Sequence, residues 1–129
     1  MIVVDAAGLV DALTGPDGVN ALRSRLADED LHAPSLLDYE VVSALRGLTL
    51  VGRLSDARAL DALTDFDDLP ITRWPFEDAL RRRAFQLRHT VSGYDAAYVA
   101  LAEALACPLL TRDRRLARSH GHGAVIEVQ

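Results

Sequence analysis

Short apolar runs alternate with segments of helical periodicity along the whole chain. Five of these runs have the length of buried strands, at residues 1–4, 31–33, 69–73, 108–111 and 124–128. The first of them, "MIVV", is continuously apolar, which is typical of a strand covered on both faces of a parallel sheet.

The segments between the runs have apolar residues at helical spacing and predict helices at 6–15, 17–30, 36–52, 55–68, 75–89, 91–105 and 112–120. Gly15-Pro16 ends the first helix, and Pro75 is expected in the first turn of the fifth. Helices between almost all of the strands predict an α/β fold, with a five-stranded parallel sheet flanked by helices. We expect one domain over residues 1–129.

Two predicted helices begin with a serine followed three residues later by an aspartate. These pairs, Ser35 with Asp38 and Ser92 with Asp95, have the spacing of a capping box. Asp95 also heads an otherwise largely apolar stripe that includes Tyr98, so its carboxylate is either a surface cap or part of a site.

Composition excludes several classes of protein. There is no lysine, since all 14 basic residues are arginine, which excludes enzymes that need a catalytic lysine. The net charge of −5 argues against indiscriminate nucleic-acid binding. The single cysteine, Cys107, is expected to be a buried apolar residue in a reducing compartment, and we expect the bacterial cytoplasm. No run approaches the roughly 18 apolar residues of a membrane span, so no membrane partner is expected.

Four acidic residues stand where exposed acids are not expected. Asp5 and Asp113 follow the first and fourth predicted strands, at the edge where ligands bind parallel sheets. Asp95 begins the helix that leads into the fourth strand, and Glu40 interrupts an apolar helix face. Each aspartate alone is equally well explained as a helix cap. Glu40 is not at a cap position; its alternative is a pairing with Arg46, although a spacing of six residues is poor for a helical pair.

Together, however, four like charges at one sheet edge would repel one another, and a divalent cation removes that repulsion. Oxygen ligands without a cysteine or histidine cluster indicate Mg²⁺, or alternatively Mn²⁺. Such an ion polarises a phosphoryl oxygen and lowers the pKa of a bound water.

At this point the sequence resembles the PIN-domain ribonucleases, and among them the VapC-type toxins of bacterial type II toxin–antitoxin systems. Four segments have the family's order and spacing: "MIVVDAAGLVDAL", "LLDYEVVSALRG", "YDAAYVALAEAL" and "PLLTRDRRLA". The resemblance implies a PIN-like fold and a Mg²⁺-dependent endoribonuclease that cleaves tRNA or rRNA and so inhibits translation. It also implies a homodimer neutralised by a small VapB-like antitoxin.

The resemblance also assigns roles to residues. Asp5, Asp95 and Asp113 would be metal ligands, and Glu40 a ligand or the residue that orients the attacking water. Thr111 would support Asp113 or a metal-bound water. One departure is Ala7, where the family commonly has Ser or Thr.

Basic and aromatic residues near these acids each have two interpretations. Arg112, Arg114 and Arg115 could contact RNA phosphates or simply form a solvated helix face. We expect Trp74, Tyr94 and Tyr98 in the core or at an interface rather than as base-stacking surfaces.

Three other functions are alternatives to a nuclease. A phosphoacceptor receiver domain and a haloacid-dehalogenase-type phosphatase both need a lysine that this chain lacks. The remaining alternative is a catalytically weak PIN domain that acts by binding RNA or a protein partner.

Overall fold

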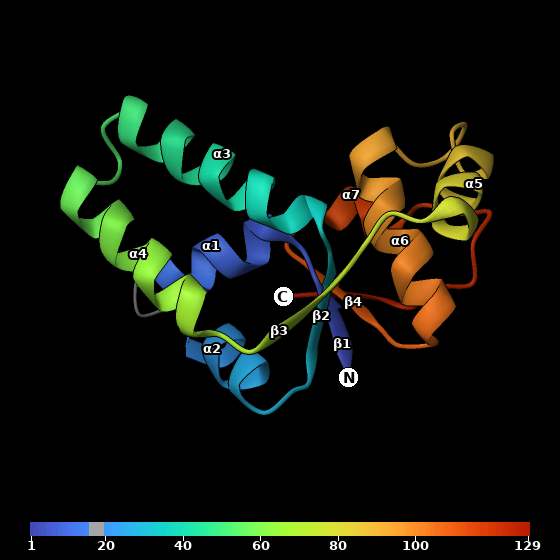
Figure 1. The fold of residues 1–129 in the computed structure, drawn as a ribbon, viewed down its shortest axis with the longest axis horizontal. Helices are drawn as coiled ribbons and strands as arrows, with labels where there is room; N and C mark the ends of the chain where they lie inside the picture. The colour runs from blue at the N-terminus through green and yellow to red at the C-terminus, as the bar shows by residue number, and fades with distance from the viewer. Residues whose placement is uncertain (16–19) are drawn as a thin grey trace.

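The computed structural model describes residues 1–15 and 20–129, which form five strands and seven helices (Figure 1). Their order along the chain is β1 (Ile2–Val4), α1 (Ala6–Thr14), α2 (Asn20–Ala27), β2 (Leu31–Pro34), α3 (Leu36–Leu50), α4 (Asp56–Asp68), β3 (Ile71–Trp74), α5 (Asp78–Gln86), α6 (Gly93–Leu105), β4 (Leu109–Thr111), α7 (Arg114–Ala117) and β5 (Ile126–Val128).

The five strands form one parallel sheet in the order β3-β2-β1-β4-β5. Strand β1 lies at the centre, where Val3 is in register with His32 of β2 and with Leu109 of β4. Because every strand runs in the same direction, the residues that follow β1 and β4 emerge at the same edge. The predicted parallel α/β fold and all five strands are confirmed.

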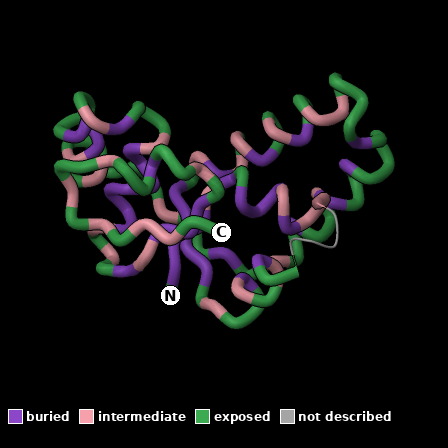
Figure 2. Tube along the Cα trace, turned by 180° about the vertical axis from the view of Figure 1, so that it is seen from behind, coloured by how far each residue is buried: buried purple, intermediate pink, exposed green. Residues whose placement is uncertain are grey.

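Each face of the sheet supports its own apolar core. Ile2 and Val4 of β1 pack with α1 to α4, whereas Val3 between them packs with α5, α6 and α7. This alternation follows from the two-residue period of a strand. Figure 2 shows the buried strands between the two helical layers. Strand β1 is thus covered on both faces, as its continuous apolar run predicted.

Helices α3 and α4 extend away from the sheet as an arm (Figure 1). Exposed apolar side chains lie along it: Val42 and Leu50 on α3, Val51 just after it, and Leu60 on α4. Exposed apolar side chains gathered on one part of a protein are typical of a contact with a partner.

Some predicted helix boundaries are wrong. Pro75 is outside α5, because its carbonyl accepts from the N–H of Glu77 in a tight turn and the helix begins only at Asp78. Helix α7 has four residues rather than nine. Pro16 and the predicted start of the second helix at residue 17 lie outside the residues that the structure describes.

The capping box predicted at Ser35 is also wrong. Ser35 has helical rather than extended backbone angles, and its hydroxyl caps no backbone N–H. Asp38 instead accepts hydrogen bonds from the guanidinium of Arg73 on β3, at 2.9 Å from Nε to Oδ2.

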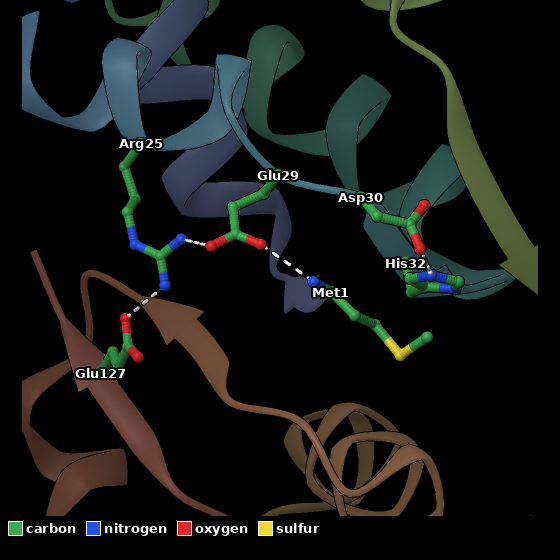
Figure 3. Close-up of polar contacts among 6 residues, drawn as sticks. All are labelled: Met1, Arg25, Glu29, Asp30, His32 and Glu127. Carbon is green, nitrogen blue, oxygen red and sulfur yellow. Dashed lines mark hydrogen bonds and ion pairs between the residues drawn. The ribbon is translucent and has the colours of Figure 1, made fainter.

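Around the amino ends of β1 and β2, acids and cations are paired (Figure 3). The Met1 ammonium lies 2.9 Å from Glu29, and Arg25 bridges Glu29 to Glu127 of β5. Asp30 lies 2.8 Å from the ring of buried His32.

Elsewhere, Cys107 is buried as predicted, and burial raises the pKa of its thiol. No helix among the described residues is long and apolar enough to cross a membrane.

Candidate active site

Asp5 stands directly after β1 and caps α1. Its Oδ1 accepts from the N–H of Gly8 at 2.8 Å, and its Oδ2 accepts from the hydroxyl of Thr111 at the end of β4. Burial raises the pKa of Asp5; these two hydrogen bonds oppose the rise, and the charges of Asp95 and Glu40 add to it. Asp5 is therefore the cap that the sequence allowed and also a desolvated carboxylate beside two other acids.

Glu40 lies one turn into α3 and faces α6. Its Oε1 accepts a 2.5 Å hydrogen bond from the hydroxyl of Tyr98, a side chain only 2% exposed. Burial raises the pKa of Tyr98, and the hydrogen bond to Glu40 and the nearby carboxylates raise it further, so the phenol remains a donor. The alternative partner, Arg46, forms no ion pair with Glu40 among the described residues.

Asp95 lies in the first turn of α6, half-buried. The capping box predicted here is wrong, because the Ser92 hydroxyl makes no bond to a backbone N–H. It donates instead to Oδ2 of Asp95, at 3.0 Å. The Ser92 side chain thus orients the Asp95 carboxylate and does not cap the first turn of α6.

Asp113 follows β4 and caps the short helix α7, where its Oδ1 accepts from the N–H of Arg115 at 2.9 Å. Its own N–H donates to Thr111 Oγ1 at 3.0 Å. Burial would raise the pKa of Asp113, but the hydrogen bonds and the charge of Arg115 outweigh it and hold that pKa below its usual range. Thr111, fully buried, is the link between Asp5 and Asp113.

The structure therefore brings Asp5, Glu40 and Asp95 together, and it leaves Asp113 at the rim. None of the first three has a cationic side chain within 4.0 Å in the described part of the chain. Asp95 and Asp113 share a polar cavity of about 300 Å³, which Ser92 and Arg115 also line.

These ligands suit a hard divalent cation, because all of them are carboxylate oxygens. The Asp5 carboxylate is also buried without a cation beside it, and burial raises its pKa. As the side chains lie, however, no three His, Cys, Asp or Glu residues in 1–15 and 20–129 surround a point that could hold a metal. The ligand roles of the four acids thus remain predictions.

Two residues of this site escaped the sequence reasoning. Tyr98 was expected to be only a packing residue, although its place on the stripe below Asp95 put its hydroxyl within the site. Ser92 was interpreted as a cap, and its serine–aspartate spacing could not distinguish a hydroxyl that caps from one that binds the carboxylate.

The three arginines predicted near RNA differ in their surroundings. Arg112 pairs with Asp11 of α1 at 2.9 Å, and Arg115 lies over Asp113 at 3.4 Å. Arg114 is exposed and forms no ion pair with any described residue.

Similar proteins were found by sequence and by structure. The PIN domain family model matches residues 2–120. Ribonuclease VapC12 of Mycobacterium tuberculosis is 46% identical over 129 residues, which cover 99% of this chain and 98% of the relative. Ribonuclease VapC1 of the same species is 48% identical over 121 residues, covering 92% and 90%.

Among solved structures, PAE2754 from Pyrobaculum aerophilum is 26% identical with a TM-score of 0.69, covering 97% of this chain and 82% of that one. The promoter-bound VapBC2 structure from Rickettsia felis has a TM-score of 0.70 at 17% identity, covering 99% and 98%, and shows the same fold. By its matched segment and its relatives, the chain belongs to the PIN-domain family, among the VapC-type ribonucleases.

Proposed function

We propose that this protein is a Mg²⁺-dependent endoribonuclease toxin that cleaves tRNA or rRNA in the bacterial cytoplasm. The observation that carries the proposal is the group Asp5, Glu40 and Asp95, three half-buried acids without a cationic partner among the described residues. Its relatives' names support RNA cleavage. A structural neighbour is described as a toxin that cleaves the sarcin–ricin loop, at 15% identity.

In this proposal Asp5, Asp95 and Asp113 hold the ion, and Glu40 either ligates it or orients the attacking water. A bound Mg²⁺ would polarise the phosphoryl oxygen and lower the pKa of a bound water. Tyr98 occupies Oε1 of Glu40 and so sets the direction of Oε2. Thr111 holds Asp5 by its hydroxyl proton and anchors the backbone of Asp113. Arg114 and Arg115 contact RNA phosphates at the rim, and Arg112 does so next to Asp11.

The test incubates purified, antitoxin-free protein with total RNA in Mg²⁺ or EDTA. We expect discrete cleavage that needs metal and disappears in Asp5→Asn and Asp113→Asn. Asp61→Asn, an exposed acid on α4, is the matched control and should cut like the wild type. If RNA is retained without being cut, and those substitutions do not change retention, the chain is instead a PIN domain that acts by binding.

We also propose a homodimer and a VapB-like antitoxin as partners. Several structural neighbours are described as VapBC or toxin–antitoxin complexes, and the exposed apolar residues of the α3–α4 arm offer a surface for a protein partner. Antitoxin arginines that reach Asp5 and Asp95 would neutralise the acids and exclude the metal. Light scattering of the free protein tests the dimer. Co-purification with the product of a short neighbouring reading frame tests the antitoxin.

A further inference from the structure

The polar cavity of about 300 Å³ that Asp95 and Asp113 share lies between the start of α6 and the short helix α7. The other polar residues of its wall are Thr90, Ser92, Ser119 and Arg115. A ligand that enters this cavity therefore meets two of the proposed metal ligands together with three hydroxyls and one guanidinium.

The protons of the three hydroxyls are already used within the chain. Ser92 donates to Oδ2 of Asp95 at 3.0 Å. Ser119 and Thr90 each donate to the carbonyl three residues before them, at 2.5 Å and 3.4 Å. Each hydroxyl oxygen can therefore offer a ligand only a lone pair, as the two carboxylates do. The cavity is thus a wall of acceptors, and its ligand has to donate hydrogen bonds.

The hydroxyl of Ser119 is also fixed in direction by His122. The ring Nε2 lies 2.7 Å from Ser119 Oγ. Because the Ser119 proton goes to a carbonyl, the ring has to donate from Nε2 to this oxygen. A hydroxyl that is held at its proton and at one lone pair does not rotate, so its second lone pair is left for a ligand in one direction.

Among the described residues of this wall, Arg115 alone is cationic. Its side chain is 89% exposed, and its guanidinium approaches the Asp113 carboxylate only at 3.4 and 3.5 Å. It can therefore also bind an anion. A second guanidinium in the cavity, such as an antitoxin arginine, would be repelled by Arg115. A nucleotide, in contrast, brings a sugar hydroxyl for the acceptors and a phosphate for the arginine.

We propose that this cavity binds the ribose of a nucleotide next to the phosphodiester that is cut, through its 2′-hydroxyl. Thr90 and Ser119 are the acceptors, and Arg115 contacts the neighbouring phosphate. The inference rests on the proposed RNA cleavage and deepens it, by naming the part of the substrate that is recognised. DNA lacks this donor, so the subsite selects RNA over DNA. The hydroxyl is held and does not react.

The test uses the antitoxin-free protein and an RNA oligonucleotide copied from the strongest cut in total RNA. Two further strands each lack one 2′-hydroxyl, on the nucleotide before or after the cut. For the wild type, kcat/KM should be about tenfold lower on one of these deoxy strands. Ser119→Ala and Thr90→Val should each lower kcat/KM about fivefold on the all-ribose strand. On the sensitive deoxy strand they should change nothing, because the donor that they would lose is already absent.

Two further variants are controls. Thr64→Val on α4 is matched to Thr90→Val, since Thr64 is exposed and its hydroxyl also donates to a nearby carbonyl, that of Leu60. It should cut all strands like the wild type. Arg115→Gln should lower kcat/KM by the same factor on the all-ribose and deoxy strands, because both contain the phosphate.

Several results would overturn the ribose subsite alone. Equal losses on both kinds of strand in Ser119→Ala and Thr90→Val would make these hydroxyls merely structural. Wild-type cleavage that neither deoxy substitution slows would exclude recognition of the hydroxyl. A deoxy strand that none of the proteins cuts would make the 2′-hydroxyl the nucleophile. Variants that cut every strand normally but bind the antitoxin more weakly would make the cavity a protein site. If the wild type cuts no RNA, the proposed function fails as well.

Discussion

Two groups of acids on the same sheet differ in how their negative charge is balanced. Just before β2, Glu29 pairs with the ammonium of Met1 and shares Arg25 with Glu127 of the edge strand β5. At the carboxyl edge, Asp5 has only neutral donors and two further carboxylates nearby. The first group stabilises the fold by itself, whereas the second retains a charge imbalance that a bound cation would remove. We therefore propose that the chemistry takes place at the carboxyl edge.

The largest effect is expected from Asp95→Asn. The amide can still accept from Ser92, so the fold should persist, but one charge of the proposed metal site is lost. We expect cleavage of total RNA to fall by more than about 100-fold, since even the outer partners of metal ligands are typically worth 10–100-fold. A large drop in thermal stability, with cleavage retained in the folded fraction, would make Asp95 a structural residue instead.

A smaller loss is expected from Tyr98→Phe, which removes the hydroxyl that orients Glu40. The Mg²⁺ concentration for half-maximal cleavage should rise about tenfold, because Glu40 loses its fixed direction. Tyr94→Phe, which removes an exposed hydroxyl, is the matched control. Unchanged Mg²⁺ dependence in Tyr98→Phe would exclude Glu40 from the metal site.

In the paired group around Glu29, the substitution Arg25→Met should lower the stability of the fold and leave RNA cleavage unchanged. It leaves Glu29 and Glu127 without their guanidinium partner, and we expect the free energy of unfolding to fall by about 1–2 kcal/mol. Urea denaturation measures this, with Arg46→Met as a control, since Arg46 is exposed and forms no ion pair in the described residues. The specific activity of the folded protein should stay the same, and a loss there would contradict the separation of the two groups.

The smallest effect concerns the sign of the pH dependence. Arg83 holds the pKa of Glu103 below 4.5, so Glu103 stabilises the fold above that pH and this contribution disappears as the pH falls through the lowered value. Burial raises the pKa of Asp5 above 3.8. Without metal, deprotonation of Asp5 therefore destabilises the fold as the pH rises from 3.8 through this raised pKa. Acid unfolding of Glu103→Gln and Asp5→Asn should therefore deviate from the wild type in opposite directions. Deviations of the same sign would contradict the contrast.

Much of the fold could be predicted from the sequence, because it depends on apolar periodicity. The run "MIVV" indicated β1, and the residue after it, Asp5, stands at the carboxyl edge as expected. Helix ends were less predictable, because Ser35 and Ser92 have hydroxyls with more than one available partner. At Ser35 a tertiary contact replaces the box, because Arg73 binds Asp38, whereas at Ser92 the hydroxyl binds the Asp95 carboxylate within the same turn.

Of the candidate site, the grouping of three acids and the support that Thr111 gives to Asp113 were predictable, whereas the rim position of Asp113 and the contacts of Tyr98 and Ser92 were not. Asp5, Glu40 and Asp95 come together because their elements begin or end at one edge. The bond between Glu40 and Tyr98 spans 58 residues, and no local pattern in the sequence specifies it.

The central claim is that the acids at the carboxyl edge bind a divalent cation. Its most direct test is calorimetric titration of the antitoxin-free protein with Mn²⁺, compared with Asp5→Asn and the control Asp61→Asn. We predict saturable binding that is lost in Asp5→Asn and unchanged in Asp61→Asn. Equal binding by all three proteins, or no saturable binding by the wild type, would contradict it.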